Sequence, residues 1–168
     1  IGILLVEGDH QIVVALEDAP EDLPWSMERK LVNEFVEGSF IDSKDAETDF
    51  NGEYYCQNLN SPDFPAAYYC LNYQKGGRNW YLPSSGELWM IYNHFEEMQN
   101  ALSIVGGQKF ITKNIDGIPV YWSSTEGNST HTWFLSLEMG CLDRWFKDYF
   151  LKVRPVSKFD FSTLKESF

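Results

Sequence analysis

The residues best suited to acid–base or nucleophilic chemistry are few and widely spaced in this chain. Its three histidines, His10, His94 and His131, fall in a predicted turn, on a predicted helix and in a late loop. No metalloprotease pair, phosphate-binding loop, GxGxxG turn or serine nucleophile elbow occurs. Glu96 and Glu97 are adjacent on a predicted helix, so their carboxylates point about 100° apart and suit solvent better than one shared substrate. The sequence therefore predicts a protein that is not an enzyme.

An acidic stretch offers the oxygen ligands that a calcium ion prefers. Its carboxylates belong to Asp42, Asp45, Glu47 and Asp49. They lack the glycine and the closing glutamate of an EF-hand loop, so a solvated acidic loop is the favoured interpretation. We expect neither a metal site nor any other cofactor.

The cysteines also lack a pattern that carries chemistry. There are three, Cys56, Cys70 and Cys141, and none is in CxxC spacing with another. An odd number cannot make a closed disulfide framework. A bridge between Cys56 and Cys70 and a set of buried free thiols both stay open, and free thiols are the commoner outcome.

Length and composition favour one folded domain over residues 1–168. Hydrophobic residues make up 43% of the chain and aromatic residues 16%, which is enough for a core. The formal charge of -12 argues against nucleic acid or an anionic membrane as a partner. No apolar run approaches the roughly 18 residues of a membrane span. Because the chain begins at Ile1 without Met, a trimmed piece of a longer precursor fits this start, and export stays open.

The elements that would position any site begin with a β-hairpin. Apolar, β-branched stretches at Ile3–Val6 and Gln11–Leu16 flank the turn residues 7–10. The acidic stretch 17–49 is broken by Pro20, Pro24 and Gly38, and we predict that it is mostly a long loop. Only Ser26–Val36 within it shows helical spacing.

Helices are predicted in the middle of the chain. Thr48 or Asp49 can cap a short helix that runs through Cys56, and a second begins at Pro65 and continues to Tyr73. Ser84 and Glu87 form a capping box that starts a longer helix, ending near Ile104. Its apolar residues recur every three or four positions, as one buried face requires. They are Leu88, Ile91, Tyr92, Phe95, Met98, Leu102 and Val105.

The last third of the chain alternates strand-like pieces with turns. The predicted strands are Phe110–Thr112, Val120–Ser123, Trp133–Leu137 and Lys152–Val156. Strands, then helical regions, then strands is the order of an α+β fold with long loops and C-terminal antiparallel strands. We expect the first and last strands to pair with each other.

An aromatic segment near the C-terminus is the best candidate for function. Trp145, Phe146, Tyr149 and Phe150 are mixed with charged residues and fit neither strict alternation nor an amphipathic helix. Phe134 lies on the strand face opposite Trp133 and Leu135, so it must be covered or offered to a partner. Clustered rings on an irregular scaffold are typical of interfaces. The sequence thus predicts a binding region within 121–156.

Several separated motifs follow one another in an order typical of a protein family. They are Trp80-Tyr81-Leu82-Pro83 with Gly86-Glu87-Leu88, then Tyr121-Trp122-Ser123-Ser124-Thr125-Glu126, then Trp133, Gly140, Lys147 and Val153-Arg154-Pro155-Val156. These motifs resemble the C-type-lectin-fold variable proteins of diversity-generating retroelements in gut bacteria and their phages, which include phage tropism determinants. The resemblance covers about Asp49 to Phe159, and residues 1–48 match more weakly.

The resemblance implies a C-type lectin fold and a ligand-binding display protein of the bacterial surface or the phage virion. Its ligand would be a surface protein or glycan of another cell. An undiversified lectin-fold module of a surface adhesin or lipoprotein is the alternative. By position, the fixed framework would be Trp122, Trp133, Gly140, Lys147 and Arg154. The diversified contact residues would be Asn128, Thr130, His131, Phe134, Ser136, Cys141, Asp143, Trp145, Phe146, Asp148, Tyr149 and Phe150.

Other activities of lectin-like proteins are not expected from this sequence. Calcium-dependent sugar-binding relatives carry Glu-Pro-Asn or Gln-Pro-Asp, where this chain has Ile118-Pro119-Val120. The related formylglycine-generating enzymes work through late-chain cysteines, and only Cys141 lies in that region. The resemblance therefore favours binding over catalysis.

Overall fold

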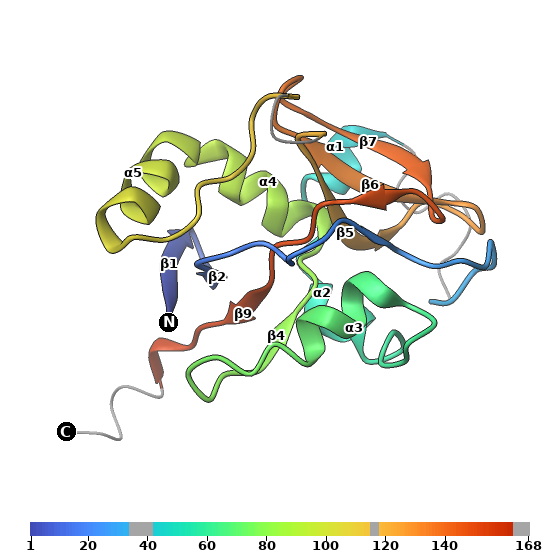
Figure 1. Cartoon of the computed structure of the whole chain (residues 1–168), viewed down its shortest axis with the longest axis horizontal. Coiled ribbons are helices and arrows are strands. Elements are labelled where there is room, and N and C mark those ends of the chain that lie inside the picture. Colours follow the sequence, from blue (N-terminus) through green and yellow to red (C-terminus); the bar gives the residue numbers. More distant parts are fainter. Residues whose placement is uncertain (34–41, 115–117, 163–168) are drawn as a thin grey trace.

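The computed structural model describes residues 1–33, 42–114 and 118–162, which form a mixed α+β fold (Figure 1). Its helices are α1 (Ser43–Ala46), α2 (Gly52–Cys56), α3 (Pro65–Leu71), α4 (Ser85–Asn93) and α5 (Phe95–Val105). Its strands are β1 (Gly2–Glu7), β2 (His10–Ala15), β3 (Leu23–Pro24), β4 (Trp80–Tyr81), β5 (Val120–Glu126), β6 (His131–Ser136), β7 (Cys141–Phe146), β8 (Phe150–Leu151) and β9 (Val156–Lys158).

The first sheet brings the two ends of the described chain together. Its strand order is β1-β2-β9-β4, and every pair is antiparallel. The predicted hairpin is confirmed, with Gly8 at a φ of 57° in its turn. The two ends of the chain do pair, but through the second strand and not the first: β2 pairs with β9, with Val14 opposite Val156, and β1 lies at the edge of the sheet. The last strand starts later than the predicted Lys152–Val156.

The second sheet has the order β5-β6-β7 and lies at the upper right of Figure 1. Strands β5 and β6 match predicted strands, whereas β7 was not predicted because its sequence alternates poorly. A small third sheet pairs β3 with β8. The strand expected at Phe110–Thr112 is wrong: the Phe110 amide and carbonyl bond the side-chain amide of Gln99 instead of a neighbouring strand.

The helices follow the predicted capping with some shifts. The Ser84 and Glu87 capping box is present at the start of α4, and Pro65 opens α3. The predicted long helix is divided at His94, which leaves helical geometry at φ −115° and ψ 30° and separates α4 from α5. Helix α2 begins at Gly52, not at the predicted cap Asp49, whose side chain is buried among hydroxyl groups.

The described residues of the acidic stretch are mostly loop, as predicted, apart from β3 and one short helix. Asp42 caps the short helix α1, whose formation was not expected. Residues 26–33 of the segment with helical spacing form no helix, and its residues 34–36 lie outside the described residues. Gly38 also lies outside them.

The core joins both sheets and the helices in one large hydrophobic cluster, with a smaller one around Val13 and Trp80. Most of the predicted apolar stripe takes part, including Leu88, Met98 and Leu102. Val105, at the end of α5, is exposed instead. The core therefore lies directly beneath β5 and β6, which carry the predicted binding region.

Candidate ligand-binding face

The hairpin of β6 and β7 gathers the predicted aromatic residues on one side of the molecule. Its register places His131 opposite Phe146 and Thr132 opposite Trp145. The ring centroids of His131 and Phe146 are 4.2 Å apart, and those of Trp145 and Tyr149 are 5.5 Å apart. Phe146 and Tyr149 stack at 6.1 Å. We call His131, Trp145, Phe146 and Tyr149 the aromatic cluster.

The cluster is accessible as well as compact. Trp145 and Tyr149 expose 44% and 47% of their surface, and neighbouring Phe150 exposes 56%. Exposed aromatic rings of this number are uncommon on a surface and mark interaction sites. Each ring packs against another ring of the cluster, which limits its rotamers before any ligand arrives. Low conformational freedom in the free state reduces the entropy lost on binding.

A buried ion pair holds the turn beneath the cluster. The Lys147 Nζ lies 3.2 Å from Glu126 Oε2, and both side chains are fully buried. The same ammonium donates to the Lys30 carbonyl at 2.8 Å and lies 4.5 Å from the Trp25 ring centroid. Burial lowers the pKa of Lys147, and the Glu126 carboxylate opposes that shift. The turn between β7 and β8 is thereby tied to the core.

The segment 25–33 closes around the same ion pair. The backbone amides of Trp25 and Ser26 both donate to the Lys147 carbonyl. The amides of Val32 and Asn33 donate to the Glu126 carboxylate at 3.1 Å. Each oxygen of this buried carboxylate therefore has a partner, as a buried charge requires. Backbone from the N-terminal third of the chain thus forms one wall of the site.

Arg29 joins the site from that wall and was missed by the sequence reasoning. Its guanidinium carbon lies 4.3 Å from the Phe146 ring centroid, and its Nη2 is 3.0 Å from both carboxylate oxygens of Asp148. A cation on a ring face contributes about 0.5–1 kcal/mol at exposed sites. No local signal in the sequence links Arg29 to residues near 148. Only the tertiary fold brings them together.

The turn between β5 and β6 forms the other rim. Asn128 Oδ1 accepts hydrogen bonds from the Thr130 amide, the Thr130 hydroxyl and the His131 amide, at 2.8 to 3.0 Å. Thr130 Oγ1 lies 2.7 Å from His131 Nδ1. Burial, followed by the positive charges of Arg144 and Arg29, lowers the pKa of His131. The imidazole is therefore held neutral near pH 7.

Phe134 and Ser136 differ from the prediction. Phe134 exposes only 7% and belongs to the main core, with its ring edge toward Trp145 at 6.1 Å. Ser136 also exposes 7%, and its hydroxyl accepts from the Met139 amide at 3.1 Å in the turn before β7. Both faces of β6 are covered, so these residues are structural.

Of the remaining predicted contact residues, Cys141 is half-buried at the far end of β7 and Asp143 is exposed.

Four of the five residues assigned to the fixed framework are held inside the fold, and Gly140 is half-buried. Trp122, Trp133, Lys147 and Arg154 are buried. Arg154 is paired with Asp18 and also donates to the carbonyls of Ala15 and Gln108. Gly140 adopts a φ of 64°, and an added Cβ would collide with the Tyr92 hydroxyl. The framework residues are therefore buried and the contact residues are partly or fully exposed, with Gly140, Phe134 and Ser136 as the exceptions.

The acidic residues considered as metal ligands serve other purposes. Asp49 accepts from the hydroxyls of Tyr55 and Thr125 at 2.9 and 2.7 Å, and Asp42 caps α1. Within residues 1–33, 42–114 and 118–162 no group of three or more His, Cys, Asp or Glu side chains could hold a metal ion. The three cysteines are free thiols.

Comparisons with known proteins show a similarity of fold. No family model matches the chain, and no curated protein matches it. Its structure is similar to the crystal structure of a fimbrial protein from Bacteroides ovatus ATCC 8483, with a TM-score of 0.61 and 18% sequence identity. The similarity covers 89% of this chain but only 36% of the fimbrial protein, so the chain spans about a third of that protein's length. At this identity the similarity shows the fold alone.

The described helices are also informative about membranes. In the parts of the chain that the structure covers, no helix is both long enough and apolar enough to span a bilayer.

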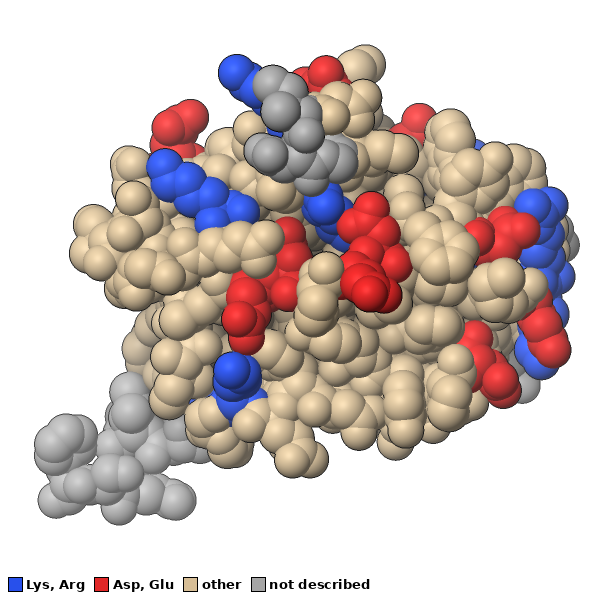
Figure 2. All heavy atoms as spheres, viewed as in Figure 1, with Lys and Arg blue, Asp and Glu red and all other residues tan. Residues whose placement is uncertain are grey.

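The surface is rich in acidic groups: Figure 2 shows acidic side chains gathered across the middle of one face, along the segment that follows β2. An acidic surface repels polyanions.

Proposed function

We propose that this chain is a ligand-binding display domain with a C-type-lectin-like fold. It presents the aromatic cluster to a protein or glycan on the surface of another cell, from a bacterial surface or a phage virion. The observation that carries the proposal is the set of exposed rings fixed from beneath by the buried Lys147–Glu126 pair. Rigid aromatic anchors on a fixed scaffold are what high-affinity interfaces use.

Several features support a lectin-like scaffold. Strand β9, near the C-terminus, pairs with β2 of the N-terminal hairpin in one sheet, and short turns join the antiparallel strands of the β5-β6-β7 sheet. The motif residues Trp122 and Trp133 lie in the core, and Glu87 caps α4. Residues with these roles resist substitution because each fills a defined space or satisfies a buried donor. The surface residues of β7 neither fill space in the core nor satisfy a buried donor.

The site supports binding better than catalysis. Burial raises the pKa of the Cys141 thiol, and the nearby Asp143 carboxylate raises it further. A raised pKa reduces the thiolate that nucleophilic chemistry needs. His131, the histidine of the cluster, hydrogen-bonds Thr130 rather than a carboxylate that would orient it as a base. We therefore propose that the domain acts without covalent chemistry and without a cofactor.

The finer proposal is that a retroelement diversifies the contact residues. Its support is the ordered motif set, together with the burial of most framework residues and the partial or full exposure of most contact positions. Sequencing the DNA around the gene should reveal a near-identical template repeat and a reverse transcriptase. If both are absent, diversification of this chain is excluded, while binding through the cluster remains testable.

An undiversified module of a surface adhesin is the second candidate. The similarity of fold to a Bacteroides fimbrial protein favours it. Under this function, the aromatic cluster would vary little among close relatives, because one ligand would be conserved. Aligning the β7 sequence across close relatives separates the two functions.

Substitution of the cluster tests binding itself. We expect the double variant Trp145→Ala with Tyr149→Ala to lose binding of the labelled full chain to glycan arrays and intact gut bacterial cells, because hot-spot rings provide most of the interface energy. Tyr54→Ala is the matched control, since Tyr54 is an aromatic residue on α2 with 63% exposure. Equal binding by the double variant and the wild-type chain would refute the proposed face.

A further inference from the structure

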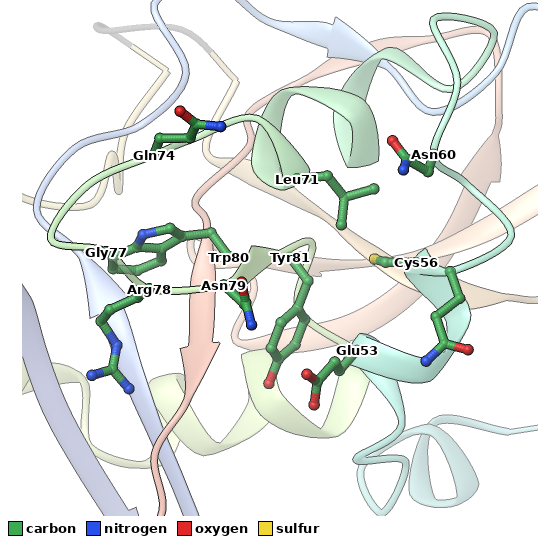
Figure 3. Close-up of a pocket in the computed structure, with 11 residues that line it drawn as sticks. Glu53, Cys56, Asn60, Leu71, Gln74, Gly77, Arg78, Asn79, Trp80 and Tyr81 are labelled. Carbon is green, nitrogen blue, oxygen red and sulfur yellow. The ribbon is translucent and has the colours of Figure 1, made fainter.

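A second pocket lies away from the aromatic cluster, between α2, the end of α3 and β4 (Figure 3). Its volume is about 620 Å³, within the range of about 300–1,000 Å³ that small-molecule sites occupy. Neither β6 nor β7 contributes to its lining. Figure 1 shows β4 and α3 in the lower part of the molecule, below the sheet that carries the cluster. The pocket is therefore a separate feature.

Primary amides dominate the polar lining of this pocket. Gln57, Asn60, Gln74 and Asn79 reach it from different segments, and all are exposed. Within the described part of the chain, none of these side chains makes a hydrogen bond to another residue. Each amide offers two N–H donors and an acceptor oxygen. Together they match a ligand whose groups both donate and accept, as hydroxyls do.

The floor of the pocket is weakly apolar. In Figure 3, Leu71 and the Cys56 sulfur lie on one side of the pocket, Tyr81 lies near the middle, and the Trp80 ring lies on the other side, near Gly77. The Trp80 Nε1 donates to the Lys75 carbonyl at 2.9 Å, and the Tyr81 hydroxyl donates to Glu87 at 2.6 Å. Trp80 and Tyr81 are buried, with their polar atoms engaged inside the fold, so the half-buried Leu71 is the apolar side chain of this lining that a ligand can contact. Gly77 lines one wall with backbone alone.

The charged groups at the pocket are already compensated. Glu53 lies 3.5 Å from the Lys158 ammonium. Arg78 donates to the Lys158 carbonyl at 2.7 Å and to the Ser157 hydroxyl at 3.2 Å. A charged ligand would have to compete with these contacts, and the net charge of -12 disfavours an anion in particular. An uncharged ligand needs no such competition.

We infer that this pocket binds a neutral carbohydrate of one or two rings through the amides of Gln57, Asn60, Gln74 and Asn79. The amides bond the sugar hydroxyls, and Leu71 contacts the C–H faces of the ring. Hydroxyl recognition by planar amides, with an apolar contact for the ring, fits sugars better than purely apolar ligands. This site is separate from the aromatic cluster, so it would bind its sugar independently of the ligand of the cluster.

NMR spectroscopy can test this inference by monitoring the side-chain amide signals of the pocket residues. The ¹⁵N-labelled full chain is titrated with glucose, galactose, mannose, N-acetylglucosamine, maltose and lactose, up to about 10 mM, a range that detects weak sugar binding. We expect at least one sugar to shift the side-chain amide signals of Asn79 and Gln57 while signals of β7 stay in place. If no sugar in the panel shifts any pocket amide, the inference is overturned.

Variants make the test specific. The double variant Gln57→Ala with Asn79→Ala should weaken the affinity for that sugar by at least about tenfold. Both side chains are exposed, so the variant should keep the wild-type melting temperature, which is checked first. Asn100→Ala, which removes an exposed amide on α5 outside the pocket lining, should bind the sugar as the wild type does. Unchanged affinity of the double variant for the sugar would overturn the inference. If the variants of the aromatic cluster still bind cells, that result contradicts only the proposed function.

Discussion

Strands β5 and β7 belong to one sheet, yet they reverse the usual distribution of polar and apolar residues. Strand β5 carries Ser123, Ser124, Thr125 and Glu126, and all are buried. Strand β7 carries Trp145, which is 44% exposed. Both strands lie at edges of the β5-β6-β7 sheet. The difference therefore arises from what covers each strand.

Strand β5 is covered by groups that satisfy most of its buried side chains, although the Ser124 hydroxyl has no hydrogen-bond partner among the described residues. The Ser123 hydroxyl donates to the Trp133 carbonyl at 2.7 Å, and the Thr125 hydroxyl donates to Asp49 at 2.7 Å. On strand β7, Trp145 is partly open to solvent and packs against the rings of Phe134 and Tyr149. The polar residues of β5 therefore lie inside the fold beneath the binding face, while the aromatic residues of β7 form its accessible surface. Burial follows the availability of partners and not polarity alone.

The largest effect should come from breaking the buried ion pair. We expect Lys147→Met to lower the free energy of unfolding by about 4 kcal/mol, because Glu126 is left charged and buried without its partner. Urea unfolding at pH 7 measures the loss. The double variant with Glu126→Gln removes the stranded charge and should recover part of it. A loss below about 1 kcal/mol would mean that the pair does not anchor the turn.

Phe134 should behave as a core residue although it lies on the predicted display strand. Phe134→Ala is expected to cost about 3 kcal/mol, because it leaves a cavity beneath Trp145. Phe134→Leu, which keeps most of the volume, should cost clearly less. Thermal or urea unfolding of both variants distinguishes a core ring from a displayed one. A cost near zero for the alanine variant would restore Phe134 to the contact set.

The buried hydroxyls of β5 should have an intermediate effect. Thr125→Val preserves shape but removes the hydroxyl that donates to Asp49 and accepts from the Ser85 amide at 2.9 Å. Two buried partners then lose a hydrogen bond, so we expect a loss of about 2 kcal/mol. Urea unfolding against the wild type gives the value, with Thr112→Val, outside the strand, as the control. Equal stability of the two valine variants would contradict the role given to Thr125.

The displayed rings should matter little to stability. Tyr149→Ala is expected to change the free energy of unfolding by less than about 1 kcal/mol, as exposed ring pairs contribute modestly. Urea unfolding at pH 7 measures the change, so that the effect of removing an exposed ring can be compared with the effect of Lys147→Met. A loss as large as that of Phe134→Ala would show that the cluster is part of the core.

The smallest effect concerns the protonation of His131. Burial and the charges of Arg144 and Arg29 lower its pKa, so an NMR titration should give a value below the usual 6.5. The folded chain then binds fewer protons than the unfolded chain near that pH. This contribution to stability is complete above about pH 6.5 and is lost as the pH falls toward the folded pKa. Arg144→Ala should raise the pKa, and an unchanged value would contradict this electrostatic cause.

Local sequence patterns predicted much of the fold. The hairpin of β1 and β2, the capping box of α4 and the Pro65 start of α3 each depend on residues within a few positions of one another. The α+β order and the location of the aromatic residues also followed from the sequence. Strand β7 did not, because an edge strand with exposed rings lacks the alternation that marks a half-buried strand.

What the sequence by itself determined is therefore the set of elements and the segment rich in aromatic residues. Only the tertiary structure decided which rings are displayed and what supports them. Arg29 meets Asp148 across 119 positions, and Lys147 meets the Lys30 carbonyl across 117. The covering of Phe134 and the gathering of Gln57, Asn60, Gln74 and Asn79 around one pocket arise in the same way. Such contacts depend on how the elements pack, and no periodicity along the chain encodes that packing.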